Sequence, residues 1–405
     1  MTRMMRTIRS VLIAATLALA SHAPEAADTG WEACLTDLTL RRINDPTIAN
    51  GTVEGLGDDG RRVSFGLGEV FYLLPTRPPE PRRDAASAGE PMMLTLVDGQ
   101  RFPVIPLESE DPDRLRVRSV WGGRERSFGL GRVLALRRAD SAGADPSDPD
   151  PLDDRVVLAN GDAVRGFVRS IGREVAIETD DGGVRRFGID AVRSVTIVND
   201  PVTEPGVQIR LWDSTRLRVE SLAARPGARG WAEVGPDGAE PFRVGFEPDA
   251  FGGLEITHDA SRLAGLWTLA STHEPTGGRA WTPEPRVMAP GRVGGPLRDI
   301  DLRAPVRVAY ELGAGAARFA CTARLVAGRW SDCELVVACR TPGGLETIAR
   351  ARLKPSEPVI RINEALPRGA RTLVVRVEPG AHGAIQDRVI LESARVRIDA
   401  LAEFE

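Results

Sequence analysis

SFGLGEVFYL (residues 64–73) recurs almost unchanged as SFGLGRVLAL (residues 127–136). Two looser copies follow, RFGIDAVRSV (186–195) and RVGFEPDAFGGLEI (243–256). The residues at one equivalent position of the four copies are Phe65, Phe128, Phe187 and Val244. They follow one another at intervals of about sixty residues. Self-similarity at this spacing is typical of a chain assembled from small modules, so the sequence predicts three to four repeats.

Each repeat has the pattern of β-structure. In the third, apolar runs at 156–158 and 175–177 alternate with the turn sequences Asn160-Gly161-Asp162 and Asp181-Gly182-Gly183. Glycine-containing turns between alternating runs predict hairpins. Four or five short, bent strands in each repeat indicate a small barrel. The first repeat shows no clear opening hairpin.

The recurring Phe-Gly pair is expected to end the last long strand of each repeat. The phenylalanine would point inward, and the glycine would permit a bend or a close backbone approach. A ligand-binding role is the alternative for this pair, but buried aromatic side chains usually belong to a core. We therefore interpret the pair as a packing element.

Two stretches with the composition of linkers separate repeats. Residues 75–91 are rich in proline, and residues 139–154 are acidic and rich in proline and serine, so both resist core formation. The acidic stretch is interpreted as a solvated spacer, because it lacks the ordered ligand spacing of a calcium loop. The repeats are accordingly predicted at residues 30–74, 92–138, 155–200 and 206–258.

The N-terminus has the organisation of a secretory signal peptide. Three arginines precede the apolar run 11–20, and Ala18-Leu19-Ala20 offers small residues for cleavage. The signal is predicted at residues 1–20, with cleavage at any point up to residue 27. The apolar run is too short to span a bilayer. We expect an exported chain that is periplasmic, cell-surface or secreted and does not span the membrane after cleavage.

Charge and cysteine content narrow the classes of partner. The formal net charge is −4, which argues against nucleic-acid binding because such binding needs clustered positive charge. Cys34 stands alone, whereas Cys321, Cys333 and Cys339 lie close together in the sequence. A disulfide between Cys321 and Cys339 is the candidate bridge, on the expectation that they lie on opposite arms of a hairpin. Buried unpaired thiols are the alternative.

The pattern of the sequence changes from about residue 261 onward. No long amphipathic helix is evident, and the pattern of strands predicts a β-sandwich. The expected strands cover residues 306–312, 317–325, 333–339, 346–353, 359–363, 372–378 and 388–398. The predicted fold class is therefore all-β, with three to four small barrel-like repeats followed by a jelly-roll β-sandwich.

The C-terminal segment also resembles a known family. The order VAYELGAGAARFACTARL, CELVVACR and TLVVRVEPGAHGAIQDRVILESARVRI is similar to the novel putative carbohydrate-binding module (NPCBM). The matching positions are Tyr310-Glu311-Leu312-Gly313, Phe319, Leu335-Val336-Val337, Leu373-Val374-Val375 and Asp387. The resemblance implies a galactose-binding-like jelly roll over residues 261–405. The repeats resemble Sm-like β units that accompany such modules in exported bacterial proteins.

Sugar binding on a β-sandwich uses an exposed aromatic platform with a few polar groups, because a pyranose ring has an apolar face flanked by hydroxyls. Trp330, in the predicted turn AGRWSDC, and Trp281, in a Pro/Gly-rich loop, are the candidate platforms. Asp332, Asp387 and Arg388 are the candidate hydrogen-bonding partners. Packing across a loop base is the alternative role for Trp330. No cofactor is expected, although Asp387 could instead support a structural calcium ion.

The sequence offers no catalytic motif. Its four histidines are scattered, and it has no His-Glu-x-x-His, Gly-x-Ser-x-Gly or phosphate-binding glycine loop. We therefore predict a non-catalytic exported binding protein whose ligand is a glycan or cell-surface polysaccharide. The alternatives are a structural or assembly protein, whose repeats and sandwich contact other envelope proteins, and an accessory to a carbohydrate-degrading enzyme.

Overall fold

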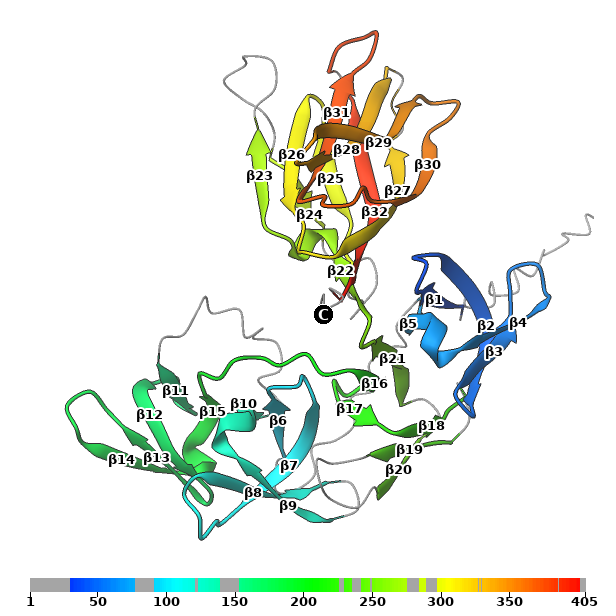
Figure 1. Cartoon of the computed structure of the whole chain (residues 1–405). Coiled ribbons are helices and arrows are strands. Elements are labelled where there is room, and N and C mark those ends of the chain that lie inside the picture. The colour runs from blue at the N-terminus through cyan, green and yellow to red at the C-terminus, as the bar shows by residue number, and fades with distance from the viewer. Residues whose placement is uncertain are drawn as a thin grey trace, which may run out of the picture.

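The computed structural model describes a chain built almost wholly of strands (Figure 1). It describes residues 30–76, 91–120, 123–138, 153–225, 229–234, 242–247, 250–274, 284–288, 297–326, 328, 330–384 and 386–400. The predicted signal peptide, most of both predicted linkers and Trp281 lie outside these ranges. Among the described residues no helix is long and apolar enough to cross a membrane. The predicted all-β fold class is confirmed.

The four repeats share one strand plan, a meander whose last strand returns to pair with the first. Repeat 1 contains β1 (Trp31–Leu35), β2 (Leu40–Ala49), β3 (Thr52–Leu56), β4 (Arg62–Gly66) and β5 (Val70–Pro75). Repeat 2 contains β6 (Met92–Leu96), β7 (Arg101–Leu107), β8 (Arg114–Ser119), β9 (Glu125–Gly129) and β10 (Val133–Arg138). Repeat 3 contains β11 (Asp154–Leu158), β12 (Ala163–Ile171), β13 (Glu174–Glu178), β14 (Val184–Gly188) and β15 (Val192–Thr196). Repeat 4 contains β16 (Gly206–Leu211), β17 (Arg216–Val219), β18 (Ser221–Ala223), β19 (Gly230–Val234), β20 (Phe242–Phe246) and β21 (Phe251–Thr257).

The Phe-Gly pair marks the point where the fourth strand of a repeat ends. In the first three repeats a 3₁₀ turn follows the glycine and leads into the last strand, at Leu67–Glu69, Leu130–Arg132 and Ile189–Ala191. Phe65, Phe128 and Phe187 are partly buried and pack against the core. The pair therefore packs and turns the chain, as the sequence predicts for the first three repeats.

An opening hairpin turn is common to all four repeats. In each turn one side-chain oxygen accepts a hydrogen bond from the backbone N–H two residues further along the chain. The accepting residues are Asp37, Asp98, Asn160 and Asp213, at 2.7, 3.1, 3.0 and 2.9 Å respectively. The residue between them has a positive φ: Leu38, Gly99, Gly161 and Ser214. Repeat 1 does have an opening hairpin, so the sequence expectation is wrong there. Leu38 in the position usually taken by glycine conceals the turn signal.

The barrels pair through their last strands. β5 of repeat 1 lies antiparallel to β21 of repeat 4, with Leu73 opposite Leu254. β10 of repeat 2 lies antiparallel to β15 of repeat 3, with Leu136 opposite Val195. In each case the two residues hold equivalent places in their repeats, so each pairing has local two-fold symmetry. The pairing is thus nested along the sequence: repeat 1 pairs with repeat 4, and repeat 2 pairs with repeat 3.

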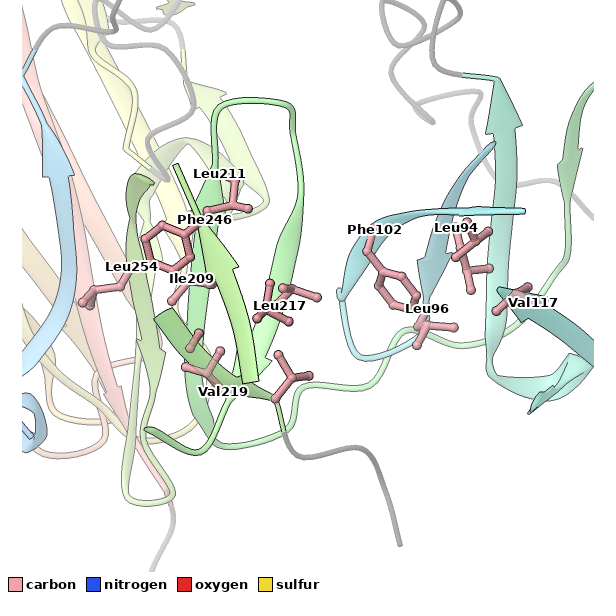
Figure 2. Packing of buried hydrophobic residues seen from close by; sticks show 14 of the residues in the cluster. Leu94, Leu96, Phe102, Val117, Ile209, Leu211, Leu217, Val219, Phe246 and Leu254 are labelled. Atoms are coloured by element: carbon pink, nitrogen blue, oxygen red, sulfur yellow. The ribbon is translucent and has the colours of Figure 1, made fainter. Parts of the chain in front are cut away.

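Buried side chains of all four repeats form one connected cluster, because neighbouring barrels share sheets. Figure 2 shows part of it: Ile209, Leu217 and Phe246 lie in repeat 4, and Leu94 and Phe102 lie in repeat 2. Each group fills the interior of its own barrel.

The C-terminal region is a sandwich of two antiparallel sheets, which confirms the predicted β-sandwich (Figure 1). One sheet contains β24 (Arg286–Val287), β25 (Ile300–Arg303), β32 (Arg388–Asp399), β27 (Ala316–Leu325) and β30 (Val359–Ala365), with β22 (Ser261–Gly265) beside β32. The other contains β23 (Ser271–Glu274), β26 (Val306–Glu311), β31 (Thr372–Pro379), β28 (Cys333–Thr341) and β29 (Gly344–Leu353). Their inner faces bury a second core that includes Tyr310, Phe319 and Val375.

The four cysteines are buried free thiols. Cys321 lies on β27 and Cys339 on β28, and these strands belong to opposite sheets. Cys321 and Cys339 therefore do not lie on one hairpin, and the predicted Cys321–Cys339 disulfide, which depended on that hairpin, is wrong. Burial raises the pKa of the Cys321 thiol to about 12 and that of the Cys339 thiol to about 11, so both favour the protonated form.

Repeat 1 docks onto the sandwich through its opening turn. Leu38 is fully buried in a small apolar cluster with Leu297 and Ala320 of the C-terminal region. Arg395 of β32, itself 5% exposed, donates to the Leu38 carbonyl oxygen from Nε (3.2 Å) and Nη2 (2.5 Å). Asn363 donates to the Asp37 carbonyl oxygen at 3.2 Å. These contacts fix the sandwich against the first barrel.

Candidate functional site

Two loops meet at one end of the sandwich. The first joins β27 to β28, and the second joins β31 to β32. The Ser331 hydroxyl donates to the Gln386 carbonyl oxygen at 3.0 Å. A Cβ on Gly380 would lie 1.8 Å from the Asp332 carbonyl oxygen, so only glycine permits this approach. The two loops therefore form one close-packed unit.

The buried Asp387 carboxylate accepts hydrogen bonds from both loops of this unit. Its side chain is 3% exposed, and its carboxylate accepts the Asp332 N–H at 2.8 Å and the Gly380 N–H at 3.4 Å. Burial raises the pKa of Asp387, and the two backbone donors oppose that rise. Asp387 thus satisfies one backbone donor from each loop and holds the loops together.

Asp332 carries the charge at the surface of the unit. Arg352 of β29 donates to both of its carboxylate oxygens, from Nε at 2.8 Å and from Nη2 at 2.5 Å. The Ala381 N–H adds a longer contact at 3.4 Å. The bidentate guanidinium lowers the pKa of Asp332 to about 2, so this carboxylate stays ionised above that pH.

Trp330 projects from the unit into solvent. Its side chain is 46% exposed, and its ring meets the His382 ring edge-on, with centroids 5.3 Å apart. The backbone N–H of Trp330 points at the Gln386 side-chain oxygen, 3.4 Å away. Trp330 thus belongs to the first loop and contacts His382 and Gln386 of the second, while much of its surface remains open.

The structure brings together three of the five predicted site residues: Trp330, Asp332 and Asp387. Arg388 follows Asp387 in the sequence, but its side chain pairs with the buried Asp301 of β25, to which Nε donates at 2.8 Å. Trp281 falls outside the described residues. Trp330 also packs against the His382 ring, with the ring planes 71° apart, so packing stays an alternative role for it.

Three residues of the unit escape sequence reasoning. His382 and Gln386 lie in a Gly-rich loop, GAHGAIQD, that gave no chemical signal beyond its Asp387. Arg352 is one of many arginines on exposed strand faces. Only the cross-loop contacts single them out, because those contacts join residues far apart in the sequence.

The two carboxylates of the unit are poorly suited to acid–base catalysis. Asp332 is held ionised by Arg352 and would make a weak general base or acid near neutral pH. Both oxygens of Asp387 accept backbone N–H groups. Within the part of the chain that the structure describes, no group of three or more His, Cys, Asp or Glu could hold a metal ion.

Comparisons with known proteins give distant similarities. No family model matches the sequence, and no curated protein matches it. One similar solved structure contains the CBM51-2 and INT domains of ZmpB from Clostridium perfringens, with 14% identity over 48% of this chain and a TM-score of 0.28. This chain spans 41% of that one.

Two further solved structures are similar. CBM51 of a Clostridium perfringens GH95, in complex with methyl-galactose, has 14% identity over 33% of this chain and 99% of its own, with a TM-score of 0.27. Tandem CBM51 modules of the family 98 glycoside hydrolase Sp3GH98 from Streptococcus pneumoniae have 11% identity over 79% of this chain and 95% of their own, with a TM-score of 0.26. At TM-scores this low, the similarities establish neither the fold nor a ligand for this chain.

Proposed function

We propose that the protein is an exported, non-catalytic carbohydrate-binding protein, and that its sandwich binds a glycan or cell-surface polysaccharide at the Trp330 unit. The observation that carries the proposal is the half-exposed Trp330 indole on two interlocked loops. The NPCBM resemblance, with its galactose-binding-like jelly roll, agrees with this assignment.

The unit supplies the two kinds of contact that a sugar needs. The open indole offers an apolar surface for the apolar face of a pyranose ring. The Asp332 carboxylate, ionised at neutral pH, and the neighbouring His382 and Gln386 offer hydrogen-bonding groups at its rim. Because the loops are already locked together, little ordering would be required when a ligand binds.

A glycan array probed with the mature full-length chain tests the proposal, followed by calorimetric titration of any sugar retained. Trp330→Ala should weaken binding by at least about tenfold, since aromatic anchors dominate such contacts. Leu345→Ala is the matched control, because Leu345 is 54% exposed on the same sandwich, in the β28–β29 hairpin, and should have no effect. An array without signal, or equal loss in both variants, would refute the proposal.

A role in assembly is the second candidate, and one observation favours it. Residues 160–163 in the opening turn of repeat 3 are exposed, whereas the turn of repeat 1 contacts the sandwich and the strands that follow the turns of repeats 2 and 4 pair with each other at Arg101 and Arg216. This role is compatible with sugar binding, since it uses a different region of the molecule.

A further inference from the structure

Two arginines face each other where repeats 2 and 4 meet. Arg101 begins β7, Arg216 begins β17, and the two lie opposite each other in an antiparallel pair. Each stands three residues after the turn aspartate of its own repeat. The equivalent residues of repeats 1 and 3 are Leu40 and Ala163. Arginine therefore occupies this position in the two repeats that meet there and in neither of the others.

A third arginine extends the pair into a row. Arg210 of β16 lies opposite Arg216 in the ladder between β16 and β17. Residues directly opposite each other in an antiparallel ladder place their side chains on one face of the sheet, with Cβ atoms about 5 Å apart. The three arginines therefore follow one another on one face. The row ends at Gly253 on one side and at Thr95 on the other, and neither residue carries a charge.

The row has more positive charge than its one carboxylate can balance. Arg210 pairs with Glu255 of β21, with Nη2 at 2.6 Å from Oε1. Among the residues that the structure describes, the side chains of Arg101 and Arg216 form no hydrogen bond or ion pair, and the Arg101 Nε is buried. Three guanidinium groups and one carboxylate leave a net charge of +2.

Arg216 lies in the middle of this excess charge and is exposed to solvent. Desolvation by the surrounding protein and the charge of Arg210 lower the pKa of Arg216, Glu255 opposes them, and Arg101 lowers it further. Arginine keeps its proton in proteins, so the shift reflects repulsion between cations and not loss of charge. Like charges directly opposite each other destabilise a sheet. An anion bound to the row would replace this repulsion with attraction.

The contact between the two repeats holds the row in place. Gln208 Nε2 donates to the Asp98 carbonyl oxygen at 3.0 Å, and the backbone N–H of Arg218 donates to Gln100 Oε1 at 3.4 Å. These bonds join the hairpin of β16 and β17 to the turn that precedes β7. The backbone positions of the row are therefore set before a ligand arrives, which lowers the cost of ordering on binding.

We propose that the three arginines form a binding site for a doubly charged phosphate group, carried by inorganic phosphate or by a phosphate monoester. The charge of such a group, about −1.5 to −2 at neutral pH, matches the excess of the row. Guanidinium groups present forked donors that suit phosphate oxygens bidentately. Arg101 and Arg216 would bind the group directly, and Arg210, already paired, would add charge beside them.

A carboxylate is the less suitable ligand, because its single charge would leave one positive charge of the row unbalanced. The site lies on the repeats and is separate from the Trp330 unit. It therefore does not depend on sugar binding by the sandwich, and either proposal can fail without the other.

Calorimetric titration of the mature full-length chain tests the proposal, with inorganic phosphate and methyl phosphate as separate probes at constant ionic strength. We expect a dissociation constant of about 0.1 to 1 mM for at least one of them. Methyl phosphate that binds as tightly as phosphate would identify a monoester as the ligand, whereas binding of inorganic phosphate alone would identify the free ion. Acetate should bind at least about tenfold more weakly.

Substitutions separate ligand binding from stability. Arg101→Gln and Arg216→Gln should each weaken phosphate binding at least about tenfold, because each removes charge-assisted hydrogen bonds. Arg216→Gln should also raise the free energy of unfolding in phosphate-free buffer, since it relieves repulsion within the row, so its loss of binding could not be attributed to unfolding. Arg216→Lys keeps the charge without the fork and should bind with intermediate affinity. Arg186→Gln, at an exposed position of β14, is the matched control and should change neither property.

Three results would overturn the proposal. The first is the absence of saturable binding with either probe up to about 10 mM. The second is a loss of affinity in Arg186→Gln equal to that in Arg216→Gln. The third is equal affinity for acetate and phosphate, which would show that the row attracts anions in general and has no site for a phosphate group.

Discussion

Replacing Leu38 with glycine separates two opposing effects at one backbone position. Leu38 has a φ of 65° and a fully buried side chain. Glycine would relieve the left-handed backbone, a gain of about 1 kcal/mol. Loss of the buried leucine side chain would cost about 2 to 5 kcal/mol. Burial is the larger effect, so Leu38→Gly should lower the free energy of unfolding by about 1 to 4 kcal/mol.

Ser214→Gly is the matched control, because Ser214 occupies the equivalent position of repeat 4 with a φ of 72° and its side chain is exposed. Only the backbone effect remains there, so this variant should gain about 0.5 to 1 kcal/mol. Both substitutions relieve the same backbone strain, but only Leu38→Gly also removes a buried side chain. The two should therefore change the free energy of unfolding in opposite directions.

Urea denaturation would measure the two free energies, and hydrogen exchange would locate the change. In Leu38→Gly, the amides of residues 36–39 and 393–397 should lose protection together, since both segments belong to the contact with Arg395. Stabilisation by Leu38→Gly equal to that by Ser214→Gly would show that the turn is not held by its burial, and the reasoning would fail.

Three further outcomes follow from the contacts of the Trp330 unit and the cores. Asp387→Ala should lower the free energy of unfolding by about 2 to 4 kcal/mol, because it leaves two backbone N–H groups without their acceptor; thermal denaturation with a glycan titration would check that binding falls as well. The lowered pKa of Asp332 means that its pair with Arg352 stabilises the fold above about pH 4 and that this contribution is lost as the pH falls toward about 2; NMR titration should find the pKa restored toward its usual range in Arg352→Ala. All four thiols should resist a thiol reagent in the native protein and react after unfolding, because burial raises their pKa and blocks access.

Local patterns in the sequence are sufficient to predict the strands and to nominate residues of the Trp330 unit. The Phe-Gly pair, the Asn160-Gly161 turn and the exposed Trp330 all follow from short-range signals, because turn chemistry and alternation act within a few residues. Asp332 and Asp387 could be nominated for the same reason, as acids beside the predicted turn and the last strand.

Long-range partners could not be read in this way. Nothing near Arg395 in the sequence indicates that it donates to the Leu38 carbonyl oxygen of the first repeat. The sequence likewise gives no sign that β5 pairs with β21, because the last strands of the repeats have similar edges. The expectation that Cys321 and Cys339 lie on opposite arms of one hairpin is wrong, because the chain places them on opposite sheets.

The nested pairing determines where the Trp330 unit lies relative to the barrels. Because β21 pairs with β5, the chain leaves repeat 4 beside repeat 1, and His258 contacts the Val70 carbonyl oxygen at 2.9 Å. Repeat 1 then meets β32 at Arg395, while the loop that carries Asp387 precedes Arg388, the first residue of the same strand. Seven residues separate Arg388 from Arg395, which corresponds to about 23 Å along an extended strand. Repeat 1 therefore leaves the Trp330 unit open, and a variant that weakens the Leu38 contact should keep its affinity for a glycan.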